Sequence, residues 1–469
     1  MLDLLYSDFL ASKRILATAC GFDVKDSQLN PMLKPFQKWV VKRALKAGKF
    51  AVFGSTGSGK GFIELEWLRL VYEHTQENVL LLAPLAVALQ FAHKEAPKFH
   101  ESVNLSDDQT GVKPGINITN YESLHKFDLT RFFGVACDES SRIKSFDAYT
   151  TKILIDRLSR TPFKLCGTAT PSPNDYVELG NHCELLDAMT RANMLAMFFE
   201  HNGGDTGKWI LKGHAKKPFF RFVSSWAVAF DKPSDLGDYE NTGYDLPQLH
   251  VYQHLVPVDT SIATDGMLFR VPDMSATGLH KEMRLTCKAR AAKVAEIIAA
   301  DPLSPWLVWC NTDYEADAVN AAVPDIVEIR GSGMTDKTRE TRLLGFLDGK
   351  VQRLLLKPKY GGFGLNLQCC WNMAFVGLSY SFEQVYQAMA RCWRYGQEHE
   401  VHAHIITAET EGPVLEAFHR KEQQHIELRS EMNVAMREEQ LKHFRKASKY
   451  EHRKEMEVPE WLKTEEEAA

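Results

Sequence analysis

The segment FAVFGSTGSGKGFIELEWLRLVYE, residues 50–73, decides the fold of this chain. A short apolar run leads into a glycine-rich stretch, and an amphipathic run follows it. A strand, a glycine loop and a helix in this order bring backbone N–H groups together at a helix N-terminus, where they can bind phosphate. Glycines are needed because a Cβ atom would crowd the bound group. The segment therefore predicts a phosphate-binding loop formed by Gly54, Ser55, Thr56, Gly57, Ser58, Gly59, Lys60 and Gly61.

Two adjacent acids, Asp138 and Glu139, follow a second apolar run, GVAC at 134–137. Ligands bind at the carboxyl ends of the strands in open parallel sheets. We expect Asp138 to hold Mg²⁺ and Glu139 to polarise an attacking water molecule. Solvated acids at the end of a strand are the alternative, and the phosphate-binding loop earlier in the chain favours the catalytic interpretation.

The loop departs from its usual pattern directly after Lys60, whose ammonium group is placed to reach the β and γ phosphates of a nucleotide. A Ser or Thr hydroxyl normally follows this lysine and binds Mg²⁺, whereas the chain has Gly61. We expect a water molecule to occupy the Mg²⁺ coordination position that the hydroxyl would fill. Asp138 would then contribute more to positioning the metal. This predicts a weaker Mg²⁺ site, and nucleotide binding without productive metal is the alternative.

Apolar runs alternate with helical patterns over two separate stretches of the chain, which is typical of parallel α/β sheets. The first stretch has such runs at 50–54, 79–83, 116–119, 135–139 and 163–170. The second has them at 306–310, 325–330, 353–357, 372–377 and 401–407. Between them the chain is aromatic, glycine-rich and irregular, and its end is helical and highly charged. We therefore expect a first lobe at 1–180, an insertion or linker module at 181–285, a second lobe at 286–410 and a charged helical tail at 411–469.

The composition of the 469-residue chain is that of a soluble multidomain protein. Lys and Arg total 56 against 61 Asp and Glu, so the net charge of -5 excludes a protein that coats DNA with a basic surface and leaves only a local basic patch. Nine cysteines without a repeated CxxC spacing predict free thiols in a reducing cytosol. No signal-peptide pattern is present at the N-terminus, and the apolar run from Val79 is interrupted by Pro84, so we expect no membrane span and a cytoplasmic location.

Short motifs follow one another in the order LKPFQ (33–37), GSTGSGKG (54–61), LLAP (81–84), TNYE (119–122), DESS (138–141), GTATP (167–171), GGFGLNLQ (361–368) and QAMARCWRYGQ (387–397). In this order the chain resembles a superfamily-two helicase motor of the Swi/Snf-related type and is most similar to the short versions encoded by bacteriophages. The resemblance covers roughly residues 30–410, and the last motif is its most specific part. It implies an α/β fold with two RecA-like parallel-sheet lobes, use of ATP and Mg²⁺, and nucleic acid as the partner.

The resemblance also implies roles for residues of the first lobe. Those implied to act on ATP are Gln37, which would contact adenine, and Lys60, Asp138 and Glu139. Those implied to contact nucleic acid, or to link that contact to hydrolysis, are Tyr121, Thr168 and Thr170. The contacts should be made to phosphates rather than to base edges, because a translocating motor has to step past any sequence.

In the second lobe, the residues implied to line the cleft or to act on the γ-phosphate are Gly362, Gly364, Asn366, Gln387, Arg391 and Arg394. Two arginines at i and i+3 of a helix point to one face, so both can enter a phosphate site as planar cations. Hydrolysis would then occur only when the cleft between the lobes closes, and closure would move one nucleic-acid contact relative to the other.

A basic and aromatic run, KWILKGHAKKPFFRF at 208–222, lies inside the expected insertion. Its basic residues are Lys208, Lys212, Lys216, Lys217 and Arg221, and its aromatic residues are Trp209, Phe219, Phe220 and Phe222. Basic heads for phosphates and aromatic faces for bases are typical of a single-strand or distorted-duplex contact. A core strand with an exposed basic edge is equally consistent with the run. His402 and His404 share one face of an expected strand, and alternation along the strand explains them without a metal.

These observations favour an ATP-driven motor that translocates on double-stranded DNA. A strand-separating helicase on DNA or RNA is one alternative. A clamp that holds ATP and nucleic acid but hydrolyses weakly is another, because Gly61 offers no hydroxyl. We expect ATP and Mg²⁺ as cofactors, duplex DNA as the favoured partner and a further protein partner through the charged tail. A phage origin would place the protein in the cytoplasm of a bacterial host.

Overall fold

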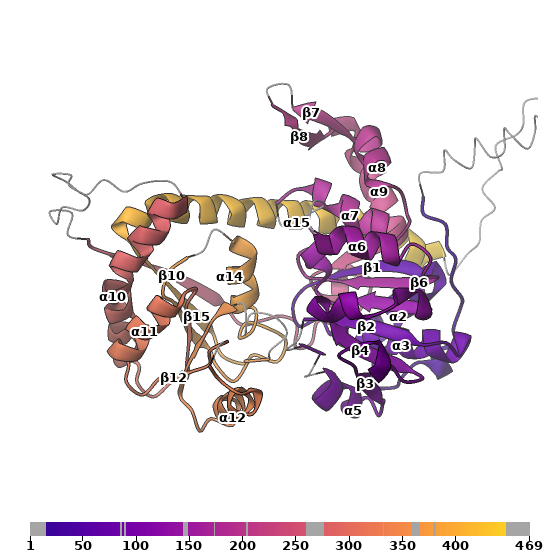
Figure 1. The fold of residues 1–469 in the computed structure, drawn as a ribbon. Coiled ribbons are helices and arrows are strands. Elements are labelled where there is room, and N and C mark those ends of the chain that lie inside the picture. Colours follow the sequence, from indigo (N-terminus) through magenta and orange to yellow (C-terminus); the bar gives the residue numbers. More distant parts are fainter. Residues whose placement is uncertain are drawn as a thin grey trace, which may run out of the picture.

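The computed structural model describes residues 16–84, 87–88, 91–143, 149–172, 174–202, 205–258, 276–331, 333–358, 366–378 and 381–446. Two sheets, each with helices packed against it, form two lobes that lie side by side (Figure 1). All strand pairs within these two sheets are parallel. The prediction of an α/β fold with two RecA-like parallel-sheet lobes and a helical C-terminal region is confirmed.

The first lobe contains a seven-stranded sheet. In spatial order its strands are β3 (Val103–Leu105), β4 (Ile116–Asn120), β2 (Val79–Ala83), β5 (Gly134–Cys137), β6 (Phe163–Gly167), β1 (Lys49–Gly54) and β9 (Ala227–Phe230). Its helices are α2 (Pro35–Ala47), α3 (Lys60–Thr75), α5 (Ala96–Lys98), α6 (Tyr149–Arg157), α7 (Leu179–Leu185), α8 (Arg191–Phe198) and α9 (Lys216–Trp226). In β1, Phe50 and Val52 pack with α2 and α3, whereas Ala51 and Phe53 pack with α6 to α9. Because the sheet is covered on both faces, its strands read as continuous apolar runs.

The second lobe contains a six-stranded sheet. In spatial order its strands are β10 (Leu249–Val256), β15 (Val401–Ala408), β14 (Asn372–Phe375), β11 (Trp306–Trp309), β13 (Arg353–Leu356) and β12 (Val327–Glu328). Its helices are α10 (Ala276–Ala300), α11 (Asp313–Ala322), α12 (Asp336–Leu347) and α14 (Phe382–Met389). Helices α10 and α11 contribute to the core on one face of the sheet, and α12 and α14 contribute to the core on the other.

The segment 181–285, expected to be an insertion or linker module, contributes a strand to each sheet. Strand β9 pairs with β1 at the edge of the first sheet, and β10 pairs with β15 at the edge of the second. The search for apolar runs missed both strands, because β9 has only four residues and β10 is an edge strand in which only Val256 is buried. The antiparallel hairpin of β7 (Phe199–Asn202) and β8 (Asp205–Leu211) projects away from the first lobe (Figure 1).

The C-terminal helix α15 (Gly412–Lys446), yellow in Figure 1, crosses from the second lobe to the first. Val414 and Phe418 belong to the core of the second lobe, while Met432 and Met436 belong to the core of the first. Buried Arg429 donates to the Asp231 carboxylate at 2.6 Å. The expected charged tail is therefore, up to residue 446, a connecting helix with one apolar face buried against both lobes. Residues 447–469 lie outside the described part of the chain.

A column of rings joins β10 to β15 at the edge of the second sheet. The rings of His250 and His402 stack at 5.1 Å, and Tyr252 stacks on both His402 and His404. His254 shares a hydrogen bond of 2.9 Å with His404. As expected, His402 and His404 share one face of the strand. No group of three metal-ligating side chains is found among the described residues. The histidines therefore stabilise strand pairing.

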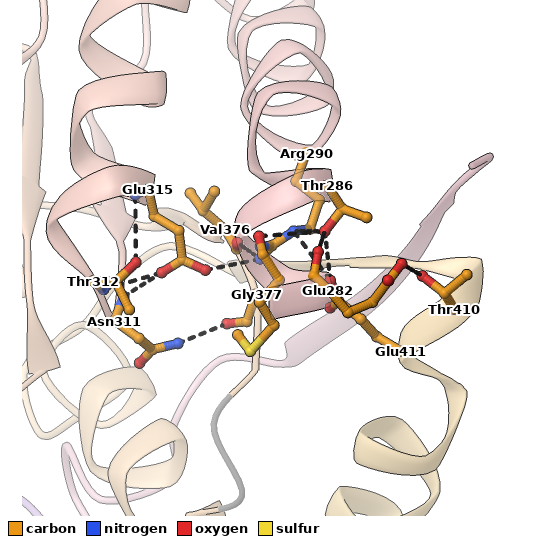
Figure 2. A network of polar contacts seen from close by, with 11 residues as sticks. Glu282, Thr286, Arg290, Asn311, Thr312, Glu315, Val376, Gly377, Thr410 and Glu411 are labelled. Atoms are coloured by element: carbon orange, nitrogen blue, oxygen red, sulfur yellow. Dashed lines mark hydrogen bonds and ion pairs between the residues drawn. The ribbon is translucent and has the colours of Figure 1, made fainter. Parts of the chain in front are cut away.

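A buried polar network centred on Arg290 holds α10 against the ends of β11, β14 and β15 (Figure 2). The guanidinium lies 2.9 Å from Glu315 and 3.4 Å from Glu411, and it also donates to the carbonyl oxygen of Val376. Gly377 makes the approach possible, because a Cβ atom there would lie 2.0 Å from Arg290 Nη1. All of these side chains are buried, so each charge depends on the others for compensation.

Replacing Arg290 with Met should lower the free energy of unfolding by about 3–5 kcal/mol, because it leaves two buried carboxylates without their cation. Urea denaturation followed by tryptophan fluorescence measures this, since Trp306 and Trp309 lie in the same lobe. Lys288→Ala, on the exposed side of α10, is the control and should change little. A loss below about 1 kcal/mol for Arg290→Met would contradict the structural role of the network.

Candidate functional site

The glycine-rich loop at 54–61 connects β1 to α3, in the strand, loop and helix order that the sequence predicts. Gly57 and Gly59 have φ angles of 82° and 79°, a conformation that L side chains rarely adopt. At Gly59 a Cβ atom would also lie 2.3 Å from Nε2 of Gln37. The glycines at these two positions are therefore required by the shape of the loop itself.

Lys60 begins α3 and turns its side chain back into the loop. Its Nζ atom donates to the carbonyl oxygens of Gly54 and Ser55, both at 3.0 Å. Burial lowers the pKa of Lys60, while the charges of Glu139 and Asp138 act in the opposite direction. The ammonium group is thus buried and hydrogen-bonded only to uncharged carbonyl oxygens. An anion bound in the loop could therefore pair with its charge.

Gln37 lies on α2 and holds the loop through its side-chain amide. Its Nε2 atom donates to the carbonyl oxygen of Ser58 at 3.1 Å, and its Oε1 atom accepts from the backbone N–H of Lys34 at 2.9 Å. The hydroxyl of Ser58 is buried without a hydrogen-bond partner. Contact of Gln37 with adenine stays a prediction, while its support of the loop is observed.

Asp138 and Glu139 directly follow β5, next to the loop. Burial, together with the charge of Glu139, raises the pKa of Asp138 to about 7. Glu139 has a φ angle of 50°, and its Oε2 atom is buried without a hydrogen-bond partner. A non-glycine residue in this conformation is uncommon and points to a constrained position. The unpartnered oxygen is available to a ligand or a water molecule.

Tyr121 was expected to contact nucleic acid, but the structure buries it. Its side chain is 5% exposed, and its hydroxyl donates to the carbonyl oxygen of Asp138 at 2.7 Å. The ring therefore supports the backbone of the acid pair and is not a surface contact. The TNYE motif still lies at the carboxyl end of β4, where the chain leaves the sheet.

Arg391 of the second lobe reaches an acid of the first, and the charges of first-lobe acids also act on Arg394. Both arginines lie in the turns after α14 (Phe382–Met389) and not on one helix, which corrects the expectation of a shared helix face. Arg391 is buried, and its Nη2 atom lies 3.6 Å from Oε1 of Glu139. Burial and the charge of Arg391 lower the pKa of Arg394 to about 10, while Glu95 and Glu139 act against this. The cleft is therefore closed in this structure. We call the cluster formed by the loop at 54–61, Asp138, Glu139, Arg391 and Arg394 the inter-lobe site.

Further contacts hold the lobes together around this site. The hydroxyl of Thr170 donates to Glu383 on α14 at 3.0 Å, and Thr168 accepts from the backbone N–H of Thr170 at 3.1 Å. Nζ of Lys34 donates to the hydroxyl of Tyr395 at 2.8 Å. Both threonines are fully buried: Thr170 connects the lobes and Thr168 supports Thr170, while a role of either toward nucleic acid stays a prediction.

The other second-lobe candidates are only partly described. Gly362 and Gly364 lie outside the described residues, and exposed Asn366 accepts from the backbone N–H of Gln368. Gln387 is buried, and neither its Oε1 nor its Nε2 atom has a hydrogen-bond partner. A buried amide without hydrogen bonds destabilises the folded protein unless another group, such as a ligand, forms hydrogen bonds with it. After Ser58 and Glu139, it is the third side chain with unpartnered polar atoms from the motifs expected to meet at this site.

Sequence reasoning missed two acids near the inter-lobe site. Glu64 lies one turn after Lys60 on α3, with both carboxylate oxygens buried and without hydrogen-bond partners. Burial, with the charge of Asp138, raises the pKa of Glu64 well above its usual value. Glu95 ends the turn η2 (Phe91–Glu95) and approaches Gly61. Glu64 could have been noticed as an acid on the apolar face of FIELEWL, whereas no local pattern marks Glu95.

The basic and aromatic run at 208–222 does not form the expected base-stacking surface. Phe219, Phe220 and Phe222 are at most 1% exposed and belong to the core of the first lobe. The run begins in strand β8 and ends in helix α9, and the three phenylalanines of α9 are buried in the core, which corrects the prediction of exposed rings at these positions. Of the three candidate lysines, Lys212 donates to the carbonyl oxygen of Ala196, Lys216 pairs with Glu431, and Lys217 is exposed.

All nine cysteines are free, as predicted, and all but Cys20 and Cys369 are buried. No helix in the described part of the chain is long and apolar enough to cross a membrane.

Comparison with known families finds one match. Residues 290–396 match the family model described as the helicase conserved C-terminal domain. The matched part runs from within α10 through strands β11 to β14 of the second sheet to the arginine motif, and it includes Arg391 and Arg394. A helicase C-terminal domain of the type found in superfamilies one and two is therefore present. No curated protein matches the chain.

Introducing a hydroxyl after the lysine should be destabilising in this chain. A Cβ atom at Gly61 would lie 2.8 Å from two ring atoms of buried Phe91, so Gly61→Thr cannot fit unless the ring moves. We expect Gly61→Thr to lower the melting temperature, and Gly61→Thr with Phe91→Leu to recover part of the loss. Thermal unfolding of both variants and of Phe91→Leu alone checks this. If the Gly61→Thr variant has the same melting temperature as the parent, the ring of Phe91 moves aside freely and the prediction is wrong.

Proposed function

We propose that this protein is an ATP-dependent translocase on double-stranded DNA, of the Swi/Snf-like class of superfamily-two helicases. The observation that carries the proposal is the 3.6 Å approach of Arg391 in the second lobe to Glu139 in the first. An arginine on one lobe that meets an acid beside a phosphate-binding loop on the other makes hydrolysis depend on closure. The motif resemblance supports the Swi/Snf-like class and an origin from a bacteriophage, hence a bacterial host cytoplasm.

The residues of the inter-lobe site fit ATP and Mg²⁺. The loop at 54–61 offers backbone N–H groups and Lys60, and Ser58, Glu139 and Gln387 carry buried polar atoms without partners. Asp138 would hold Mg²⁺, which takes one or two carboxylates and completes its shell with phosphates and water. When bound, the metal would neutralise charge that develops on the β and γ phosphates.

The proposed reaction uses the chain's own groups in a definite order. Lys60 would leave its two carbonyl acceptors and bind the phosphates, while Glu139 would orient the attacking water and accept its proton. Arg391 and Arg394 would stabilise the charge on the transferred phosphoryl group. Hydrolysis and product release would weaken these contacts across the cleft, so the two lobes could move relative to each other on the DNA.

A weakly hydrolysing clamp is the second candidate, and one observation favours it. Position 61 has no hydroxyl, and the ring of Phe91 leaves no room for one. If no other group serves the metal, ATP would bind and close the cleft without efficient turnover. The strand-separating helicase has no comparable support among the described residues and is kept as an outcome of the test with DNA substrates.

Lys60→Ala, Glu139→Gln and Arg394→Ala should each reduce ATP turnover on the order of 10² or more, because each removes a group expected at the γ-phosphate. Glu139→Gln keeps the loop and should still bind ATP, whereas Lys60→Ala should weaken binding. A phosphate-release assay with duplex DNA, beside an equilibrium ATP-binding measurement, separates the two effects. Arg284→Ala, on the exposed face of α10, is the control. Turnover within twofold of the parent for Arg394→Ala would remove its assigned role.

Duplex DNA should stimulate hydrolysis more than single-stranded DNA or RNA, and stimulation should weaken steeply with salt because the contacts are to phosphates. At the same ATP concentration, the protein should displace the third strand of a triplex but should not separate the strands of a forked duplex. Efficient fork opening without triplex displacement would favour the strand-separating helicase. Binding of ATP and DNA with slow turnover on every polymer would favour the clamp.

A further inference from the structure

The missing hydroxyl at position 61 has a neighbour that could replace it. A Cβ atom at Gly61 would lie 3.1 Å from Oε2 of Glu95. A Ser or Thr side chain at this position would therefore point toward the Glu95 carboxylate. The π-helical turn η2 places Phe91 and Glu95 together against this residue, so the space that a side chain would fill is taken by a ring and a carboxylate.

The charge of Glu95 acts on groups from both lobes at the inter-lobe site. It is among the charges that raise the pKa of Asp138, the acid expected to hold Mg²⁺. It also acts on Arg394 of the second lobe. Glu95 thus lies against the start of α3, and its charge acts on Asp138 and Arg394, although it comes from a segment that the sequence motifs do not include.

The site carries a balance of charges that suits a cation bound together with phosphates. Asp138, Glu139 and Glu95 supply three carboxylates against the three cations Lys60, Arg391 and Arg394, and a fourth acid, Glu64, lies beside them with its pKa raised by burial, which favours its neutral form. A bound nucleotide would add several negative charges, which a divalent cation offsets. Buried oxygens without hydrogen-bond partners, Oε2 of Glu139 and Oγ of Ser58, belong to the same cluster and also call for a ligand.

We propose that the carboxylate of Glu95 supplies the oxygen ligand to nucleotide-bound Mg²⁺ that Gly61 lacks, either directly or through one held water molecule. Mg²⁺ prefers hard oxygen ligands, and a carboxylate is at least as good a donor as a hydroxyl. The assignment rests on the proposed function, because it concerns the metal of an ATP site. With Glu95 as a metal ligand, the protein would hydrolyse ATP without the usual hydroxyl. The proposal therefore argues against the weakly hydrolysing clamp.

The test compares ADP binding with and without Mg²⁺, which needs no turnover. For the parent protein, Mg²⁺ should tighten ADP binding measured by titration calorimetry. For Glu95→Gln, the Mg²⁺ concentration for half-maximal tightening should rise on the order of tenfold or more, as when a group that supports a metal site is removed. ADP affinity in EDTA should stay that of the parent, which shows that the loop and the fold are intact. Asp107→Asn, an exposed acid of the same lobe, should behave as the parent in both conditions.

An unchanged Mg²⁺ dependence in Glu95→Gln overturns the proposal. Glu95 could instead act by positioning Arg394, and the double variant with Arg394→Ala distinguishes this. If the metal effect of Glu95→Gln persists in the Arg394→Ala background, Glu95 serves the metal, and if it disappears there, Glu95 serves only the arginine and the proposal is wrong. A parent protein that binds no ADP in either condition would refute the proposed function itself, which is a separate result.

Discussion

Opposite charges that meet across the cleft are the interaction on which the inter-lobe site depends. Arg391 and Glu139 come from different sheets, and each is buried in a place where a lone charge would be strongly disfavoured. Burial lowers the pKa of Arg391, and the carboxylate of Glu139 opposes that shift. The two lobes therefore compensate each other's buried charges only while they are together, which couples the chemistry of the site to the arrangement of the lobes.

The connecting helix α15 adds a second constraint. It contributes apolar side chains to the cores of both lobes, and Arg429 on it donates to the carbonyl oxygen of Ala169, between the two threonines of the GTATP motif. That motif in turn contacts α14 of the second lobe through Thr170. The same strand end is thus joined to the second lobe by a direct hydrogen bond and by a helix that spans the molecule (Figure 1).

The features of the fold that depend on a pattern of consecutive residues could be predicted from the sequence. The loop at 54–61 and the acids after β5 lie where their local patterns place them. What could not be predicted comes from residues brought together by packing: the edge strand β10 resembles a loop because half of it is exposed, and Glu95 carries no local signal because only the fold brings it to Gly61. The rings of α9 were misread because their helical spacing, which indicates a buried face, was outweighed by the nearby lysines.

The length of α15 limits how the lobes can move. A continuous helix of 35 residues is about 50 Å long and resists bending far more than a loop of the same length. Both of its ends are anchored in hydrophobic cores, so a simple scissor-like opening would require the rod to bend or one end to detach. Rotation of one lobe around the long axis of the rod would likewise turn the apolar side chains at one end out of their core. The helix therefore acts as a rigid spacer, and a large movement of one lobe relative to the other requires one of its two ends to be released.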